Sequence, residues 1–156
     1  MARRAFVWSA ALLTLAFGSI RARAANESEK EHCISAADQG QQLRDDSKYQ
    51  LAREAFARCA RETCPNVVKQ ECGQWLHELD EKSPTVVLGA QDRKGSDLAD
   101  VKVTMDGTPF ATTLDGKPLP ADPGDHVFRF EAPGLAPAEE HVAIRAGEKN
   151  RVIDVT

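Results

Sequence analysis

The chain has 156 residues, of which 20 are Lys or Arg and 24 are Asp or Glu, so its formal net charge is −4. That length allows one ordinary domain or two small ones. An acidic chain with 28% charged residues excludes a simple nucleic-acid binder, which would carry a basic excess, and a protein with several membrane spans.

Residues 1–24 predict a secretory signal peptide. A pair of arginines precedes an uncharged, mostly apolar run over 5–20, and small residues then predict cleavage between Ala24 and Ala25. As a helix this run would be about 24 Å long, which is short of the roughly 30 Å of a bilayer core. An uncleaved anchor and a twin-arginine export signal are the alternatives. Cleavage would lower the net charge from −4 to −8, because the segment holds four arginines and no acid.

The next segment, 25–82, predicts three antiparallel helices near 28–45, 48–62 and 66–80. It is rich in Ala, Glu, Gln, Leu and Arg, and its apolar residues recur at helical spacing. Ser47 is the predicted N-cap of the second helix, and Asn66 that of the third. Short turns between the helices favour a small bundle.

The order of residues along this bundle resembles a tetratricopeptide repeat. The family places glycine, aromatic and small residues at fixed offsets of a helical hairpin. The matching residues here are Gly40, Leu43, Tyr49, Ala52, Phe56 and Cys59, with Pro65 closing the hairpin. The match covers about one repeat and the first helix of a second, whereas stable arrays usually need at least ~3 repeats. The resemblance implies a role in protein interaction.

The last segment, 85–156, predicts a small antiparallel β-sandwich after a linker at 80–84. Apolar and polar residues alternate over several short stretches, which turn-forming residues separate. The predicted strands lie near 85–91, 101–105, 126–131, 142–144 and 152–155, with turns at 106–107, 115–116 and 147–148. The predicted fold class is therefore α+β, with the helical segment first.

A Pro-Gly turn in this segment carries a second resemblance. Pro123 and Gly124 precede a strand in which His126, Phe128 and Phe130 share one face, and another Pro-Gly pair follows. Pro fixes φ and Gly permits a left-handed conformation, so the turn should deliver both phenylalanines to the core. The pattern resembles the PEGA domain, and carboxypeptidase-regulatory-like sandwiches share its outline. Both resemblances imply a non-catalytic envelope or surface module, and the two-module arrangement resembles exported proteins of myxobacterial type.

All four cysteines lie in the helical segment. Behind a signal peptide, Cys33, Cys59, Cys64 and Cys72 predict two disulfides, since so small a bundle needs covalent support. The favoured pairing is Cys33–Cys59 with Cys64–Cys72, because residues 33 and 59 come level in a hairpin that turns near residue 46. The alternative is Cys59–Cys72 with Cys33–Cys64, because 59 and 72 straddle the turn at Pro65 evenly.

The sequence predicts no cofactor and no metal site. His32 and His77 lie near cysteines, but the C-x2-C spacing of structural zinc sites does not occur. Asp92, Asp97 and Asp100 faintly resemble a calcium loop, although the EF-hand order of ligands is missing.

Two histidines are the candidates for acid–base chemistry. Glu140 and His141 could form a carboxylate–histidine pair, and His126 could act as a base. The simpler interpretation of Glu140 and His141 is a solvated strand edge. The simpler interpretation of His126 is a histidine at the edge of the core that forms a hydrogen bond to a turn. We predict that the protein is not an enzyme.

The predicted function is that of a periplasmic or secreted, non-catalytic protein in interaction, scaffolding or adhesion. The expected partner is another envelope protein or a cell-wall component. Nucleic acid is not an expected partner, and the membrane is contacted only transiently through the signal peptide. The alternatives are a module that binds cell-wall carbohydrate or peptidoglycan, and a hydrolase that uses Glu140 and His141.

Overall fold

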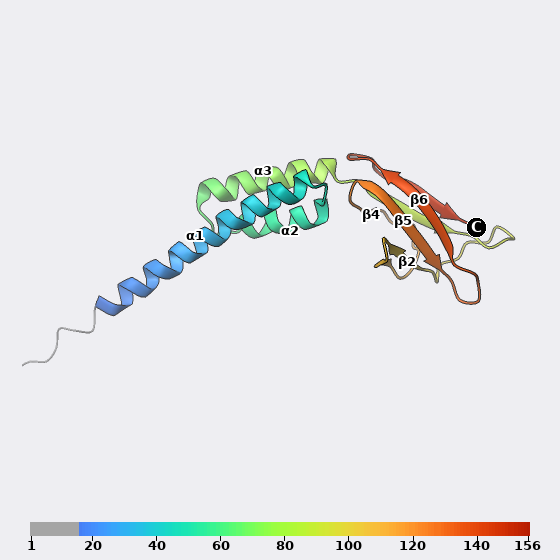
Figure 1. Ribbon diagram of the computed structural model, residues 1–156, viewed down its shortest axis with the longest axis horizontal. Helices are drawn as coiled ribbons and strands as arrows, with labels where there is room; N and C mark the ends of the chain where they lie inside the picture. The colour runs from blue at the N-terminus through green and yellow to red at the C-terminus, as the bar shows by residue number, and fades with distance from the viewer. Residues whose placement is uncertain (1–15) are drawn as a thin grey trace, which may run out of the picture.

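The computed structural model describes the backbone of residues 16–156 and the side chains of residues 27–156. Three helices come first: α1 (Ala16–Asp45), α2 (Tyr49–Cys59) and α3 (Asn66–Lys82). Seven strands follow: β1 (Thr85–Ala90), β2 (Lys102–Met105), β3 (Thr108–Ala111), β4 (Leu119–Pro120), β5 (Gly124–Glu131), β6 (Ala138–Ile144) and β7 (Arg151–Val155). The helical bundle and the sandwich lie end to end, which gives the molecule an elongated shape (Figure 1). The α+β class and the order of its two parts are as predicted.

The predicted signal peptide lies mostly outside this description. Helix α1 begins at Ala16 and runs without a break past Ala24 and Ala25, whereas the sequence predicted a helix from about residue 28. Export and cleavage between Ala24 and Ala25 stay predictions. Within the described residues, no helix combines the length and hydrophobicity that crossing a bilayer requires.

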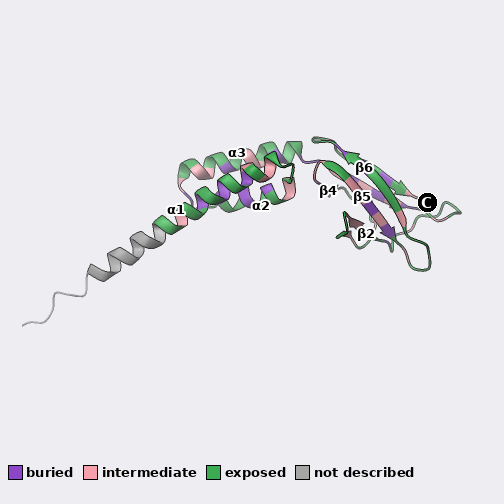
Figure 2. Cartoon of the chain, in the orientation of Figure 1, coloured by how far each residue is buried: buried purple, intermediate pink, exposed green. Residues whose placement is uncertain are grey.

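The helical core is small and lies on the predicted stripe of α2. Ala52, Phe56 and Cys59 are fully buried, and Trp75 of α3 packs on Phe56 with 5.4 Å between ring centroids. Gly40 of α1 lies against the same ring, since a Cβ atom there would come 2.4 Å from it. Figure 2 shows that the buried residues of the bundle lie on the sides of the helices that face one another.

Neither predicted N-cap is present. Ser47 has a φ of +62° and lies in the turn before α2, whose cap residue is Lys48. Asn66 is the first residue of α3, and Pro65 precedes it as the cap residue, without a side-chain bond. In the three-residue turn between α1 and α2, Ser47 is the residue in the left-handed conformation, so it does not have the extended backbone of an N-cap.

The disulfides follow the alternative pairing, and the favoured pairing was wrong. The bonds are Cys33–Cys64 and Cys59–Cys72, with Cα–Cα distances of 5.8 and 5.9 Å. Cys59 points inward from α2 to Cys72, the two residues that straddle the Pro65 turn. The turn itself then carries Cys64 to α1, so one bridge fastens the turn before α3 to α1 and the other fastens α3 to the end of α2. Both disulfides are intramolecular and are consistent with an oxidising, extracytoplasmic compartment.

The strands form two sheets, with orders β4-β1-β7 and β3-β2-β5-β6. Their inner faces bury one core, which includes Phe128 and Phe130 as the Pro-Gly pattern predicted. Gly124 has a φ of +145°, and the turn at Asp106 and Gly107 has φ values of +52° and +79°. One pairing departs from the predicted antiparallel arrangement, because β1 and β7 are parallel. The chain crosses from one sheet to the other between β6 and β7, so β7 starts at the same end as β1.

The predicted linker is shorter than expected, because α3 continues to Lys82. Only Ser83 and Pro84 separate α3 from β1, and both are buried. The Ser83 hydroxyl donates to the Leu79 carbonyl at 2.7 Å, which closes the end of the helix. The two parts therefore meet across a short and ordered connection.

The sandwich caps two helix ends of the bundle. The Asp122 carboxylate, between β4 and β5, accepts a 2.9 Å hydrogen bond from the backbone N–H of Gln50 in the first turn of α2. The Lys149 ammonium, before β7, donates to the carbonyls of Asp80, at 2.9 Å, and Ser83 at the end of α3. An anion at a helix N-terminus and a cation at a helix C-terminus both complement the helix dipole. This junction fixes the direction in which the sandwich extends from the bundle.

Candidate functional site

A cavity lies at the end of the sandwich far from the helices. It has a volume of about 580 Å³, and its floor comes from the inner faces of both sheets. Val101 and Phe130 contribute from one side and Ala90 and Val155 from the other, with Leu98 beside them. Cavities of this size and apolar character are typical of ligand sites.

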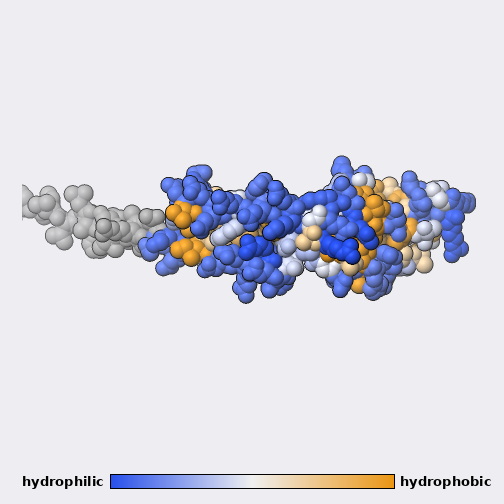
Figure 3. Space-filling model, turned by 90° about the horizontal axis from the view of Figure 1, so that it is seen from above, coloured by the Kyte–Doolittle hydropathy of each residue, from blue (hydrophilic) through white to orange (hydrophobic). Residues whose placement is uncertain are grey.

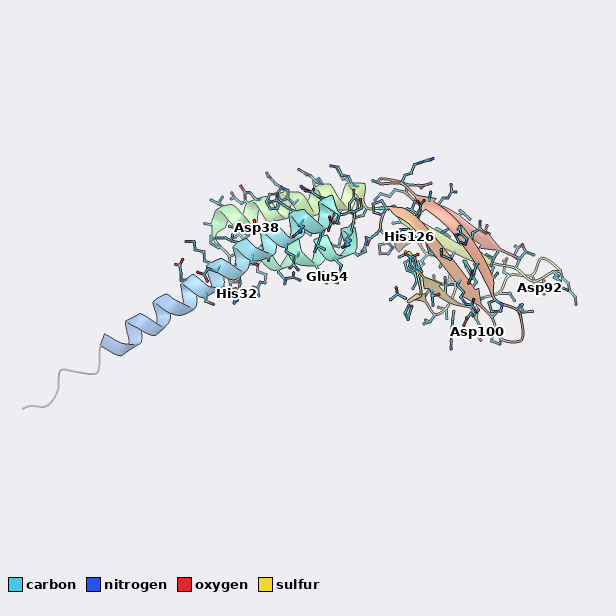
Figure 4. All side chains as sticks on the ribbon, viewed as in Figure 1. His32, Asp38, Glu54, Asp92, Asp100 and His126 are labelled. Atoms are coloured by element: carbon cyan, nitrogen blue, oxygen red, sulfur yellow. A yellow bond between two sulfur atoms is a disulfide. The ribbon has the colours of Figure 1, made fainter. Side chains whose placement is uncertain are left out.

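A tightly folded loop forms one lip of the cavity. The Asp92 carboxylate accepts hydrogen bonds from the backbone N–H groups of Lys94, at 2.8 Å, and Ser96, at 2.9 Å. These bonds from Ser96 and Lys94 lower the pKa of Asp92 below its usual range, because they favour the ionised carboxylate. Figure 4 shows Asp92 in the loop at the far end of the sandwich. The sequence raised Asp92 as a possible calcium ligand, and its carboxylate instead holds its own loop.

The turn between β5 and β6 forms the other lip. Gly134 has a φ of +77°, and the Leu135 N–H donates to the Ala132 carbonyl at 3.2 Å. The Leu135 side chain is 52% exposed, although it lines the cavity. Figure 3 shows one face of the molecule, on which hydrophobic residues gather over part of the sandwich and over the end of the bundle away from it, while the far tip of the sandwich is hydrophilic.

His126 lies at the opposite end of the sandwich, facing the helices (Figure 4). Its Nδ1 is 2.7 Å from the Asp106 carboxylate, and its Nε2 is 3.0 Å from the Asp122 carbonyl. Burial raises the pKa of Asp106, but the hydrogen bond from the Val127 N–H and the contact with His126 outweigh this effect and lower it. His126 thus braces the turn at Asp106 and the loop that carries Asp122, in agreement with the simpler interpretation of this residue. The pattern Pro123-Gly124-His126 belongs to the junction and not to the cavity.

Glu140 and His141 do not form a catalytic pair. They are consecutive residues of β6, so their side chains lie on opposite faces of the sheet. Both are exposed, and within residues 27–156 neither makes a hydrogen bond to the other. The strand edge that they form is solvated.

The residues considered as metal ligands are not brought together. Among the described residues, no group of three or more His, Cys, Asp or Glu side chains could hold an ion. All four cysteines are in disulfides, His32 and His77 are exposed on separate helices, and Asp97 accepts a hydrogen bond from Gln91. Asp100 lies apart from the Asp92 loop, at a small cavity of about 240 Å³.

Sequence reasoning missed both the cavity and the junction. The cavity is lined by segments that lie far apart in the chain, and strand alternation does not encode how such segments come together. The junction depends on Asp122 and Lys149, which look like ordinary surface charges until the bundle is placed against them. The pairs Pro133-Gly134 and Lys94-Gly95 were the available signals of ordered turns at this end.

Comparison with known proteins adds no family assignment: a scan against protein-family models and a search of curated proteins give no match.

Proposed function

We propose that this protein is an exported, non-catalytic component of the cell envelope that binds another protein and acts in scaffolding or adhesion. The bundle resembles a tetratricopeptide hairpin and the sandwich resembles a PEGA-like module, and both resemblances favour interaction over catalysis. The predicted signal peptide and the two disulfides favour a periplasmic or secreted location.

One structural observation carries most of this proposal. The bundle is closed by two disulfides, the sandwich caps two of its helix ends, and a cavity of about 580 Å³ opens at the far end. Such a molecule holds a binding surface at a constant distance from its helical part. Scaffolds and adhesion modules require this property, because a partner must be presented in one place.

The test is photo-crosslinking in the cells that produce the protein. A photoreactive amino acid would be placed at three exposed positions, namely Glu54 on α2, Leu135 at the cavity and Val152 on β7. We expect oxidised protein in the envelope or secreted fraction and a covalent adduct with another protein from at least one position. Reduced protein that stays in the cytosol, or the lack of any adduct, would contradict the proposal. Retention on purified cell-wall sacculi without a protein adduct would support the carbohydrate-binding alternative.

A further inference from the structure

We propose that the cavity at the far end of the sandwich binds an acidic peptide segment of a partner protein, with one or two aliphatic or aromatic side chains inserted between the sheets. This inference rests on the proposed function and assigns the surface that performs it.

The floor of the cavity suits apolar side chains. Val101, Phe130 and Val155 line it from both sheets, so an inserted side chain would contact carbon atoms on two sides. A volume of about 580 Å³ exceeds that of a single leucine or phenylalanine side chain and leaves room for a second. Leu135 is half exposed at the rim, where a bound segment would cover it.

The rim of the cavity carries more positive than negative side-chain charge, because its lining holds two cations and one acidic side chain, Asp92. Arg93 and Lys94 belong to the lining, and neither side chain makes a hydrogen bond or an ion pair within residues 27–156. The neighbouring acids are engaged, since Asp92 accepts two backbone hydrogen bonds and Asp97 accepts one from Gln91. The two cations are therefore available to carboxylates of a partner. They are a local exception on a chain whose net charge is −4.

Both lips are ordered before any partner arrives. The Asp92 N–H donates to the Ser96 carbonyl and the Gly95 N–H donates to the Asp92 carbonyl, both at 2.9 Å, so the loop that carries the cations is closed on itself. Pro133 and Pro137 restrict the facing turn. A site that is already formed loses little conformational entropy when it binds.

The shape of the cavity favours a peptide over a long acyl chain. The lining residues of the β5–β6 turn are exposed to solvent, including Leu135, Ala136 and Pro137, so the cavity is open to water beside them. An acyl chain needs apolar contact around its full circumference, whereas a peptide buries its side chains and leaves its backbone in water. The open side is therefore where the backbone of the bound segment would lie.

The test is selection followed by direct binding. A random heptapeptide library on phage would be selected against the oxidised full-length protein, and enriched peptides would be measured by fluorescence anisotropy. We expect enriched sequences to place Asp or Glu beside Leu, Ile or Phe. Replacing the acids of such a peptide with Lys, or its apolar residues with Ser, should weaken binding at least tenfold.

Matched variants locate the site. Removing both rim cations, with Arg93→Ser and Lys94→Ser, should weaken binding about five- to tenfold and reduce its dependence on salt. The control removes two cations elsewhere, with Arg145→Ser and Lys117→Ser, and should leave binding unchanged. Leu135→Ser should weaken binding, whereas Val152→Ser, at a similarly exposed apolar residue outside the cavity, should not.

Three results would overturn the proposal: no enrichment, enriched peptides without acids, or binding that the Arg93, Lys94 and Leu135 variants leave unchanged. Tight binding of dodecanoate at the cavity without peptide binding would assign it to an amphiphile instead. Crosslinked partners from Glu54 or Val152 together with a failed peptide test would reject this site and keep the proposed function.

Discussion

Asp122 stabilises a helix that belongs to the other half of the molecule. Because its carboxylate is the cap of α2 and Lys48 provides no side-chain bond there, removing it leaves the Gln50 N–H without this partner. We expect Asp122→Ala to lower the free energy of unfolding by about 1 kcal/mol, as for an ordinary N-cap. Asp125→Ala is the control, since Asp125 is exposed in the next strand and makes no side-chain hydrogen bond within residues 27–156. Equal loss in both variants, measured by urea unfolding, would show that the cap contributes nothing.

Asp106 should make the sandwich sensitive to acid. Its pKa is lower in the folded protein than in the unfolded chain, so the ionised carboxylate adds stability above the unfolded value near 4, and this contribution disappears as the pH falls through the folded value. Asp106→Asn should therefore be less stable than the wild type at pH 7, with the difference shrinking below about pH 4. Thermal unfolding from pH 2 to pH 8 measures this. A constant difference over that range would contradict the assignment, and Asp125→Asn serves as the reference.

At the scale of the elements, the contact between α1 and α2 depends on a missing side chain. Gly40→Ala would push a methyl group into the Phe56 ring, and we expect a loss of about 1–3 kcal/mol, as in other overpacked cores. Gly73 of α3 offers the matched control, because a Cβ atom there meets nothing within 4 Å. Gly73→Ala should stabilise the protein by about 0.5–1 kcal/mol through helix propensity. Chemical denaturation of both variants measures these changes in the free energy of unfolding. A Gly40→Ala variant that is more stable than the wild type would contradict the close contact.

One disulfide joins α3 to α2, and the other joins the turn before α3 to α1. Removing the buried bridge with Cys59→Ala and Cys72→Ala should cost about 2–4 kcal/mol. Digestion without reduction should release one peptide pair that contains Cys33 and Cys64 and another that contains Cys59 and Cys72. Fragments joined as Cys33–Cys59 would contradict the connectivity described here.

Which elements can be predicted from the sequence depends on how local their causes are. The sequence was sufficient to predict the buried stripe of α2, with Ala52, Phe56 and Cys59, and the buried face of β5 around Phe128. Each of these patterns reports burial within a single helix or strand. The sequence was not sufficient to predict the helix caps or the disulfide pairing. The caps depend on the backbone conformation of Ser47, and the pairing depends on where the turn at Pro65 places Cys64. The parallel pairing of β7 and the cavity were out of reach, since both depend on contacts between segments far apart in the chain.

At the scale of the whole molecule, the caps at the junction should determine its rigidity. Lys149 and Asp122 hold two helices from the same side, so a protein with Lys149→Met and Asp122→Ala should keep both cores but lose its fixed direction. Small-angle X-ray scattering should show a broader distribution of interatomic distances for this double variant, with unchanged circular dichroism. The pair Lys117→Met and Asp125→Ala is the control. An unchanged scattering profile would show that Ser83 and Pro84 alone keep the halves in line.

The parallel pairing of β1 with β7 has a practical consequence for anyone who handles this protein. Because both strands run away from the bundle, Val155 and Thr156 reach the same tip as the cavity, and both belong to its lining. A purification tag, a fluorophore or a solid support attached after Thr156 would stand at the entrance. Immobilisation chemistry therefore belongs on the helices, where an exposed position such as Glu54 leaves the tip unobstructed.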